Sequence, residues 1–234
     1  MKPSLPAPPA DWRPTAAVFD CDGVLMDTET AWAGVQEQVC ADYDVAFGEA
    51  SLKELMGLSA ADVARWITDR AAEAAAEKGR EGPDTDEVYE HLIEVEASVV
   101  SGILEPLPGA LETVRAFAER MPVAVARNST AQVLHRKVHA LGLEGTITTW
   151  VSSDDVTHGK PAPDIYREAV RRLGVEPGQA LAIEDSPAGT TAASRAGLWV
   201  LGVPNGHDEP LSSHFIADSL ADPRVREFMT GWGL

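Results

Sequence analysis

Carboxylates stand at the ends of two short apolar runs of the sequence. Asp20 and Asp22 come directly after the first run, and Glu184 and Asp185 follow a later one. Lys160 comes shortly after a third run. Carboxylates gathered in one place repel each other and are costly to hold together without a cation. Because oxygen ligands favour a hard ion, these residues indicate a Mg2+ site before a zinc or copper site.

The pattern of apolar runs predicts the elements that would bring these charged residues together. Beyond Pro106, helix-like segments alternate with short runs of strand-forming residues, which is typical of βαβ units and a parallel sheet. With the first run included, the expected strands are 16–19, 123–126, 146–151, 180–183 and 199–203. Ligands of open α/β sheets bind at the carboxyl ends of the strands, and the charged residues follow the strands at those ends.

The segment between the first strand and Pro106 has a different period. From Thr28 to about Leu104, apolar residues recur with the three- and four-residue spacing of amphipathic helices. A helical block therefore interrupts an α/β domain after its first strand. The expected organisation is a Pro-rich leader at 1–14, a core at 15–27 and 105–234, and a helical insertion at 28–104.

Composition excludes several classes of protein. The 234 residues include 19 basic and 37 acidic side chains, a formal net charge of −18, which argues against a nucleic-acid partner. No apolar stretch reaches the ~18–20 residues of a membrane helix. The two cysteines, Cys21 and Cys40, form neither a disulfide framework nor a zinc pattern. We therefore expect a cytoplasmic protein with no membrane or nucleic-acid partner.

Three motifs resemble the haloacid dehalogenase-like (HAD) superfamily, in the right order and spacing. They are Asp20-Cys21-Asp22-Gly23-Val24, Gly159-Lys160-Pro161-Ala162-Pro163-Asp164, and Glu184-Asp185-Ser186-Pro187-Ala188-Gly189. The similarity runs from about residue 15 to 207. The resemblance is to the subgroup with a helical cap after the first strand. It implies an α/β fold with a Rossmann-like parallel sheet core, helices on both faces and an inserted all-helical cap.

The resemblance also implies Mg2+-dependent phosphoryl transfer, and it assigns roles to the motif residues. Asp20 would attack phosphorus and form an aspartyl-phosphate. Mg2+ would be held by Asp20, the Asp22 backbone carbonyl and Asp185, with Glu184 as a further ligand or just behind them. Lys160 would neutralise charge between nucleophile and phosphate. Asp22 would protonate the leaving oxygen and later take a proton from water, which favours phosphate esters over halo-acids.

The chain departs from the family at the end of its second core strand. Where a Ser or Thr would bind the transferring phosphoryl group, this chain has Arg127, followed by the expected Asn128 and Ser129. Arg127 would bind phosphate bidentately, or it would turn outward and leave Ser129 or backbone N–H groups to hold the anion. One alternative is therefore a catalytically impaired phosphate-binding or sensing protein.

The favoured function is a phosphatase for a small phosphorylated metabolite, with a sugar or polyol phosphate preferred. A sugar phosphomutase of the same family is the other enzyme alternative, but Trp32 occupies the position of its cap histidine. The candidate substrate contacts in the cap are Glu29, Trp32, Gly57, Leu58 and Ser59. His158 and His207 lie near motif ends, and we expect neither to be essential. We expect a monomer or a weak homo-oligomer.

Overall fold

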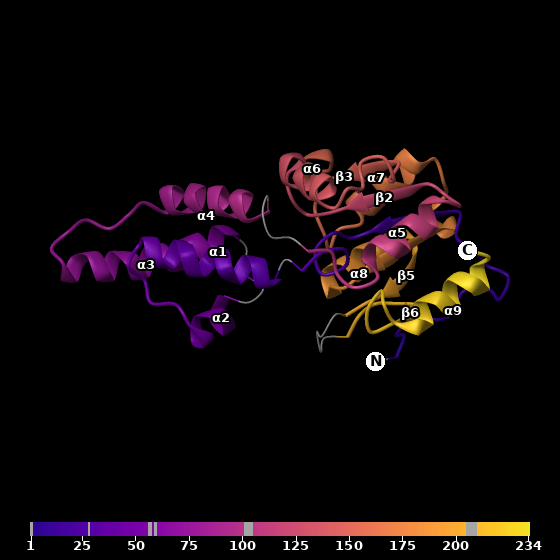
Figure 1. Cartoon of the computed structure of the whole chain (residues 1–234), viewed down its shortest axis with the longest axis horizontal. Coiled ribbons are helices and arrows are strands. Elements are labelled where there is room, and N and C mark those ends of the chain that lie inside the picture. Colours follow the sequence, from indigo (N-terminus) through magenta and orange to yellow (C-terminus); the bar gives the residue numbers. More distant parts are fainter. Residues whose placement is uncertain (1, 28, 56–57, 59, 101–104, 205–209) are drawn as a thin grey trace. The chain divides into compact units, whose positions relative to one another are not determined.

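The computed structural model of the chain describes residues 2–27, 29–55, 58, 60–100, 105–204 and 210–234. Two compact units divide the chain, one made of residues 1–27 and 105–234 and the other of residues 28–104 (Figure 1). We call the first unit the core and the second the cap. Among the described residues, no helix combines the length and the apolar character needed to cross a bilayer.

The core is built on a parallel sheet of six strands in the order β3-β2-β1-β4-β5-β6. The strands are β1 (Ala16–Phe19), β2 (Val123–Ala126), β3 (Thr149–Val151), β4 (Ala180–Glu184), β5 (Trp199–Gly202) and β6 (Phe215–Ile216). Every residue of β1, β2 and β4 is buried, as expected for central strands that are covered on both faces. Because β1 and β4 are parallel neighbours, their carboxyl ends lie next to each other.

Helices cover both faces of this sheet. The core helices are α5 (Ala110–Ala118), α6 (Ala131–Ala140), α7 (Asp164–Leu173), α8 (Pro187–Ala196) and α9 (Pro223–Trp232), with short 3-10 turns at η1 (Ser153–Asp155) and η2 (Pro177–Gln179). On one face, α7 and α8 pack against alternate strand residues such as Val18, Ala126 and Ala182. On the other, the ring of Phe19 meets that of Phe117 on α5 at 5.7 Å. The predicted fold class is confirmed.

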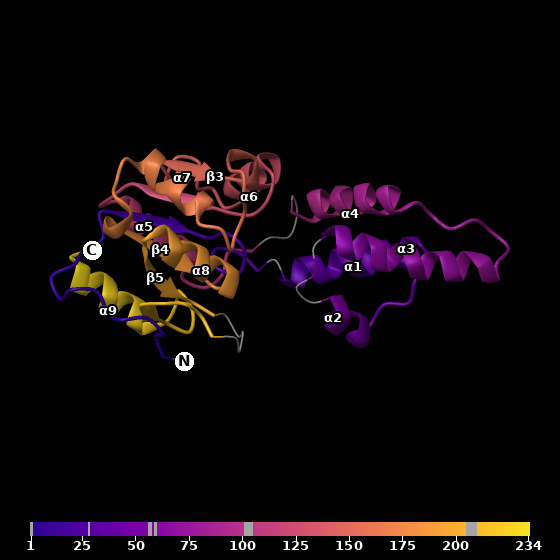
Figure 2. The same cartoon turned by 180° about the vertical axis from the view of Figure 1, so that it is seen from behind.

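The N-terminal segment crosses the far edge of the core. Its backbone N–H groups at Ser4 and Leu5 donate to the carbonyl of Ser213 at 3.0 and 2.9 Å. The ring of Trp12 packs among aromatic rings of β5, β6 and α9, with ring centres 5.5 Å from Trp199 and 6.1 Å from Trp232. Figure 2 shows this segment, drawn in indigo, beside the yellow helix α9. The Pro-rich N-terminal segment therefore has hydrogen bonds and aromatic contacts with the core.

The cap is all helical in the residues that the structure describes. Its helices are α1 (Glu29–Asp42), α2 (Glu49–Leu55), α3 (Ala60–Glu77) and α4 (Thr85–Val100). They enclose a separate apolar cluster to which α1 gives Val35 and Val39, α3 gives Val63 and Ile67, and α4 gives Leu92. These are the residues whose helical spacing marked the insertion in the sequence.

Strands β4 and β5 differ by one residue from the sequence-based prediction, and β3 and β6 differ from it by more. The run expected over 146–151 forms a strand only from Thr149, because the N–H groups of Thr146 and Ile147 both donate to the carbonyl of Leu143 and form a turn. Strand β6 was not predicted at all. It has two residues, too few to show the two-residue alternation by which a strand is recognised.

Candidate active site

Asp20 stands directly after β1, at the carboxyl edge of the sheet. Its backbone N–H continues the ladder to β4 by donating to the carbonyl of Ile183 at 2.9 Å. This pairing brings Asp20 next to Glu184, the last residue of β4, and to Asp185, which follows it. One carboxylate oxygen from each of the three residues lies within 4.8 Å of the others, and all three residues are buried. The structure thus brings together three of the four carboxylates that the sequence predicted to meet.

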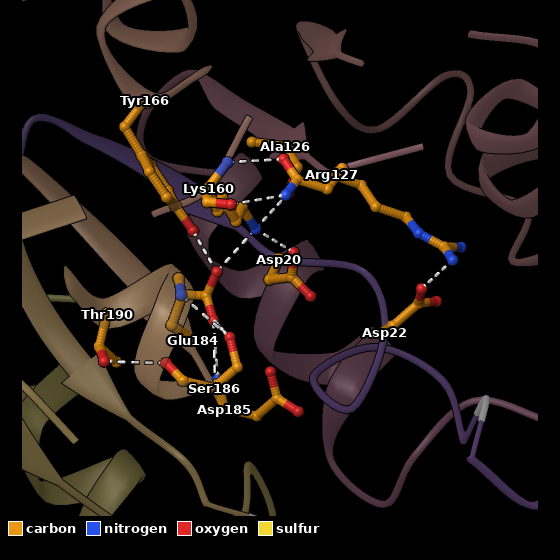
Figure 3. Close-up of polar contacts among 12 residues, drawn as sticks. Asp20, Asp22, Ala126, Arg127, Lys160, Tyr166, Glu184, Asp185, Ser186 and Thr190 are labelled. Atoms are coloured by element: carbon orange, nitrogen blue, oxygen red, sulfur yellow. Dashed lines mark hydrogen bonds and ion pairs between the residues drawn. The ribbon is translucent and has the colours of Figure 1, made fainter. Parts of the chain in front are cut away.

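Lys160 joins this cluster from the loop before α7. Its ammonium group pairs with Asp20 and donates to Glu184 Oε1 at 2.6 Å and to the carbonyl of Ala126 at 3.1 Å (Figure 3). Asn128 holds the lysine backbone from both sides. It accepts from the Lys160 N–H at 2.8 Å and donates to the Lys160 carbonyl at 3.1 Å. Asn128 therefore fixes where Lys160 enters the site.

Glu184 is completely buried, and both of its carboxylate oxygens accept hydrogen bonds. Oε1 accepts from Lys160 and from the hydroxyl of Tyr166 at 2.6 Å. Oε2 accepts from the hydroxyl of Ser186 at 3.1 Å and from two backbone N–H groups at 3.2 and 3.3 Å. The carboxylate is held rigidly and serves as an anchor for Lys160.

Burial and mutual repulsion make the cluster unfavourable for carboxylates alone. Burial raises the pKa of Asp20 to about 7, with the charge of Glu184 adding to the rise and that of Lys160 opposing it. Burial also raises the pKa of Asp185 to about 9, with further increases from Asp20 and Glu184. For Lys160, burial alone would lower the pKa, but Asp20 and Glu184 outweigh it and raise the pKa. One lysine leaves excess negative charge, so the site suits a cation.

Gly23 leaves room for Asp185 in this cluster. A Cβ at Gly23 would stand 1.8 Å from Asp185 Oδ2, and the glycine has a left-handed φ of 69°. A residue with a side chain would both strain the backbone and displace the carboxylate. Both the close approach of Asp185 and the left-handed backbone therefore require glycine at position 23.

Asp22 lies apart from the carboxylate cluster. Its Oδ2 pairs with the guanidinium of Arg127, and its Oδ1 accepts from Lys137 Nζ at 2.8 Å (Figure 3 for Arg127). Arg127 thus reaches the carboxylate of Asp22, a partner that the sequence-based interpretation did not consider. Lys137 was missed altogether. A signal for it existed, because this lysine falls on the apolar stripe of its helix, beside Leu134 and Val138.

The other candidate residues have varied surroundings. Ser129 has a buried hydroxyl oxygen with no hydrogen-bond partner among the described residues. His158 is exposed, and its Nδ1 lies 3.1 Å from a carboxylate oxygen of Asp164. Trp32 is half-buried against the apolar cluster of the cap. Glu29 begins α1, and Leu58 is exposed. Gly57, Ser59 and His207 lie outside the described residues.

The match to a protein family settles where this arrangement belongs. Residues 17–203 match the family described as haloacid dehalogenase-like hydrolase. The chain belongs to this family. The resemblance inferred from the three motifs is confirmed, and the cap unit is the helical insertion of one HAD subgroup.

Relatives of this HAD-like chain include several phosphatases. A probable pseudouridine-5'-phosphatase of Drosophila melanogaster is 30% identical over 226 residues, covering 92% of this chain and 93% of the relative. The fructose-1-phosphate phosphatase YqaB of Escherichia coli is 29% identical, covering 80% and 94%. The β-phosphoglucomutase structure from Clostridium difficile has a TM-score of 0.69 at 20% identity, covering 94% and 97%, and shows the shared fold. The chain is a HAD-like phosphatase, an enzyme of the phosphoric monoester hydrolases.

Proposed function

We propose that this HAD-like enzyme is a Mg2+-dependent phosphatase that hydrolyses a small sugar or polyol phosphate through an aspartyl-phosphate on Asp20. The observation that carries the proposal is the position of Asp20, which is buried at the end of β1 and paired with Lys160 beside two further carboxylates. The substrate class is supported by the sugar phosphate named in the Escherichia coli relative. The small phosphorylated metabolite is the proposed partner.

The residues present fit a hard divalent cation. The donors are all oxygens, and the pKa values of Asp20 and Asp185 are raised first by burial and then by the charges of neighbouring carboxylates. Because both Glu184 oxygens already accept hydrogen bonds, we assign the ligand role to Asp20, Asp185 and the backbone carbonyl of Asp22, with Glu184 behind them. A bound Mg2+ would neutralise charge on the phosphoryl group, which a carboxylate nucleophile requires.

The side chains then divide the work of two displacements. A carboxylate oxygen of Asp20 attacks phosphorus, while the ammonium group of Lys160 balances the charge shared by nucleophile and phosphate. Asp22 gives a proton to the leaving oxygen as the ester bond breaks. It then accepts a proton from the water that attacks the aspartyl-phosphate, so that free phosphate leaves and the acid is restored.

We assign the transferring phosphoryl group to donors at the β2–α6 junction. The Ser129 hydroxyl is buried and lacks a partner among the described residues, so an anion oxygen would satisfy it. Arg127 stands two residues earlier and contributes positive charge while it contacts Asp22. Asn128 contributes by holding Lys160. Since Arg127 has a charged partner at the site, its presence does not by itself indicate an inactive protein.

The cap would choose the substrate, and Glu29 and Trp32 remain our candidate contacts for its organic part. A cytoplasmic location is proposed on the two buried free thiols, Cys21 and Cys40, which fit a reducing compartment. We propose a monomer or a weak homo-oligomer.

The test is a screen of sugar and polyol phosphates for phosphate release with Mg2+ and with EDTA, run with the wild-type protein and Asp20→Asn. Wild-type activity should require Mg2+, and the variant should retain below about 1% of it because the amide is no nucleophile. Circular dichroism checks that the variant is folded. Activity of Asp20→Asn well above that level, with contamination excluded, would remove Asp20 from its role.

A further inference from the structure

Lys137 is a buried charge that none of the roles above uses. It lies on α6, its side chain is 1% exposed, and its flanking residues Leu134 and Val138 are buried apolar groups. Removing an ammonium group from water costs several kcal/mol unless a partner compensates it. The partner that the structure gives is Asp22, whose Oδ1 accepts from Lys137 Nζ at 2.8 Å. The buried ammonium group of Lys137 is therefore compensated by the carboxylate of Asp22.

Each carboxylate oxygen of Asp22 pairs with a cation from the segment formed by the end of β2 and the following helix α6. Arg127 directly follows β2 and pairs with Oδ2, and Lys137 on the following helix pairs with Oδ1. The side chain of Arg127 is 16% exposed, whereas that of Lys137 is shut off from solvent, so Lys137 is the more firmly fixed of the two. Because each oxygen of the Asp22 carboxylate has its own ion pair, the carboxylate has little freedom to rotate.

We propose that Lys137 is a positioning residue that acts through Asp22, and this role rests on the function proposed above. An acid must lie within hydrogen-bond reach of the leaving oxygen, and a small misplacement costs rate. The contacts of Lys137 with Oδ1 and of Arg127 with Oδ2 hold the Asp22 side chain in one orientation for the transfer of its proton to that oxygen, and the carboxylate that remains afterwards keeps both partners. When it takes the proton of the attacking water, it becomes the acid again, so protons balance over the cycle.

The leaving group provides a readout that a merely structural lysine would not affect. An alkoxide leaves poorly without a proton, whereas p-nitrophenolate leaves well without one. Loss of Lys137 should therefore harm the first phosphoryl transfer from an alkyl ester much more than from the nitrophenyl ester. The parameter to compare is kcat/KM, because it reports the steps up to that transfer and not the later hydrolysis.

The experiment measures kcat/KM of the full chain with Mg2+ on fructose 1-phosphate and on p-nitrophenyl phosphate. For Lys137→Met we expect a loss of about 10-fold or more on the sugar ester and below about 3-fold on the nitrophenyl ester. Lys137→Arg should restore most of the difference, because it keeps a cation. Arg136→Met, which removes the neighbouring cation of α6, should leave the ratio of the two esters unchanged.

A double variant shows whether the lysine acts through Asp22. In Asp22→Asn, the further change Lys137→Met should alter kcat/KM less than about 2-fold, because the acid is already lost. The double variant also removes both members of the Lys137–Asp22 pair, so neither charge of that pair remains buried without the other. Equal losses on the two esters, or full additivity in the Asp22→Asn background, would overturn the role while the proposed function stands. A wild-type protein that releases phosphate from neither ester would overturn both.

Discussion

The hydroxyl of Tyr166 helps to position Lys160 through their shared partner Glu184. It donates to Glu184 Oε1 at 2.6 Å, and Lys160 donates to the same oxygen. The ammonium group also lies 5.2 Å from the centre of the tyrosine ring. Burial, followed by the charge of Glu184, raises the pKa of Tyr166, so the phenol remains a hydrogen-bond donor throughout the neutral range. Through Glu184 it helps to fix the ammonium group that faces Asp20.

We expect Tyr166→Phe to lower kcat by about 10- to 150-fold with little change in KM, because a hydrogen bond to a charged group contributes ~1.5–3 kcal/mol and each ~1.4 kcal/mol is tenfold in rate. The ring stays and keeps its packing, so the loss should come from a looser Lys160. Steady-state kinetics and thermal unfolding check this. Tyr89→Phe, at a tyrosine that is 40% exposed, is the control for stability. A rise in KM with unchanged kcat would show that Tyr166 serves substrate binding.

At this scale the sequence predicts motif residues well and their supports poorly. Asp20, Lys160 and Glu184 could be placed together because each stands in a recognisable motif after a strand. Lys137 and Tyr166 stand on the apolar faces of α6 and α7, where a sequence pattern shows only that they face the core. Which carboxylate each would meet depends on strand order, and no local pattern contains that order.

The first turn of helix α8 packs against Glu184. Pro187 opens the helix, and the Ser186 hydroxyl caps it by accepting from the Gly189 N–H at 3.0 Å. The first turn lies directly against Glu184. A Cβ at Gly189 would stand 1.8 Å from Glu184 Oε1, so there is no space for even a methyl group.

Gly189→Ala should therefore displace Glu184 and, with it, Lys160. We expect a loss of at least ~2 kcal/mol in unfolding free energy, since the methyl group overpacks a buried site, together with loss of most activity. The matched control is Gly231→Ala, in helix α9, where an added Cβ meets no atom within 4 Å. That change should stabilise the protein by ~0.5–1 kcal/mol, the usual gain of alanine over glycine in a helix. Chemical denaturation of the wild type and the two variants measures their unfolding free energies. Equal values for the wild type and Gly189→Ala would show that α8 can shift to admit the methyl group.

Elements differ in how far their sequence predicts them. The central strands are continuous apolar runs that end at charged residues, and their bounds were predicted closely. The bounds of β3 were wrong at its start, because the turn formed by Thr146 and Ile147 uses residues that are as apolar or β-branched as those of a strand. The turn differs from a strand in its backbone hydrogen bonds, which run from Thr146 and Ile147 to the carbonyl of Leu143.

For the whole molecule, the balance of charge in the site couples metal binding, stability and pH. In the unfolded chain aspartates lose their protons near pH 4. In the folded protein without metal, Asp20 keeps its proton to about pH 7 and Asp185 to about pH 9, chiefly because both are buried. Between these values the folded state binds more protons than the unfolded state. The contribution of these groups to stability is therefore full below about pH 4 and is lost as pH rises through 7 and 9.

Mg2+ should reverse this loss, because it binds the ionised carboxylates and displaces their protons. We expect the rise in melting temperature at saturating Mg2+ to be larger at pH 8.5 than at pH 6, and the apparent Kd for Mg2+ to tighten at least ~10-fold between them. Thermal unfolding and calorimetric titration measure both. In Asp185→Asn, which lacks the carboxylate whose pKa burial raises to about 9, the metal-free protein should resist pH 8.5 better and gain little from Mg2+. A Mg2+ effect of equal size at both pH values would mean that the carboxylates of the cluster are already ionised at pH 6, and that burial does not govern their protonation.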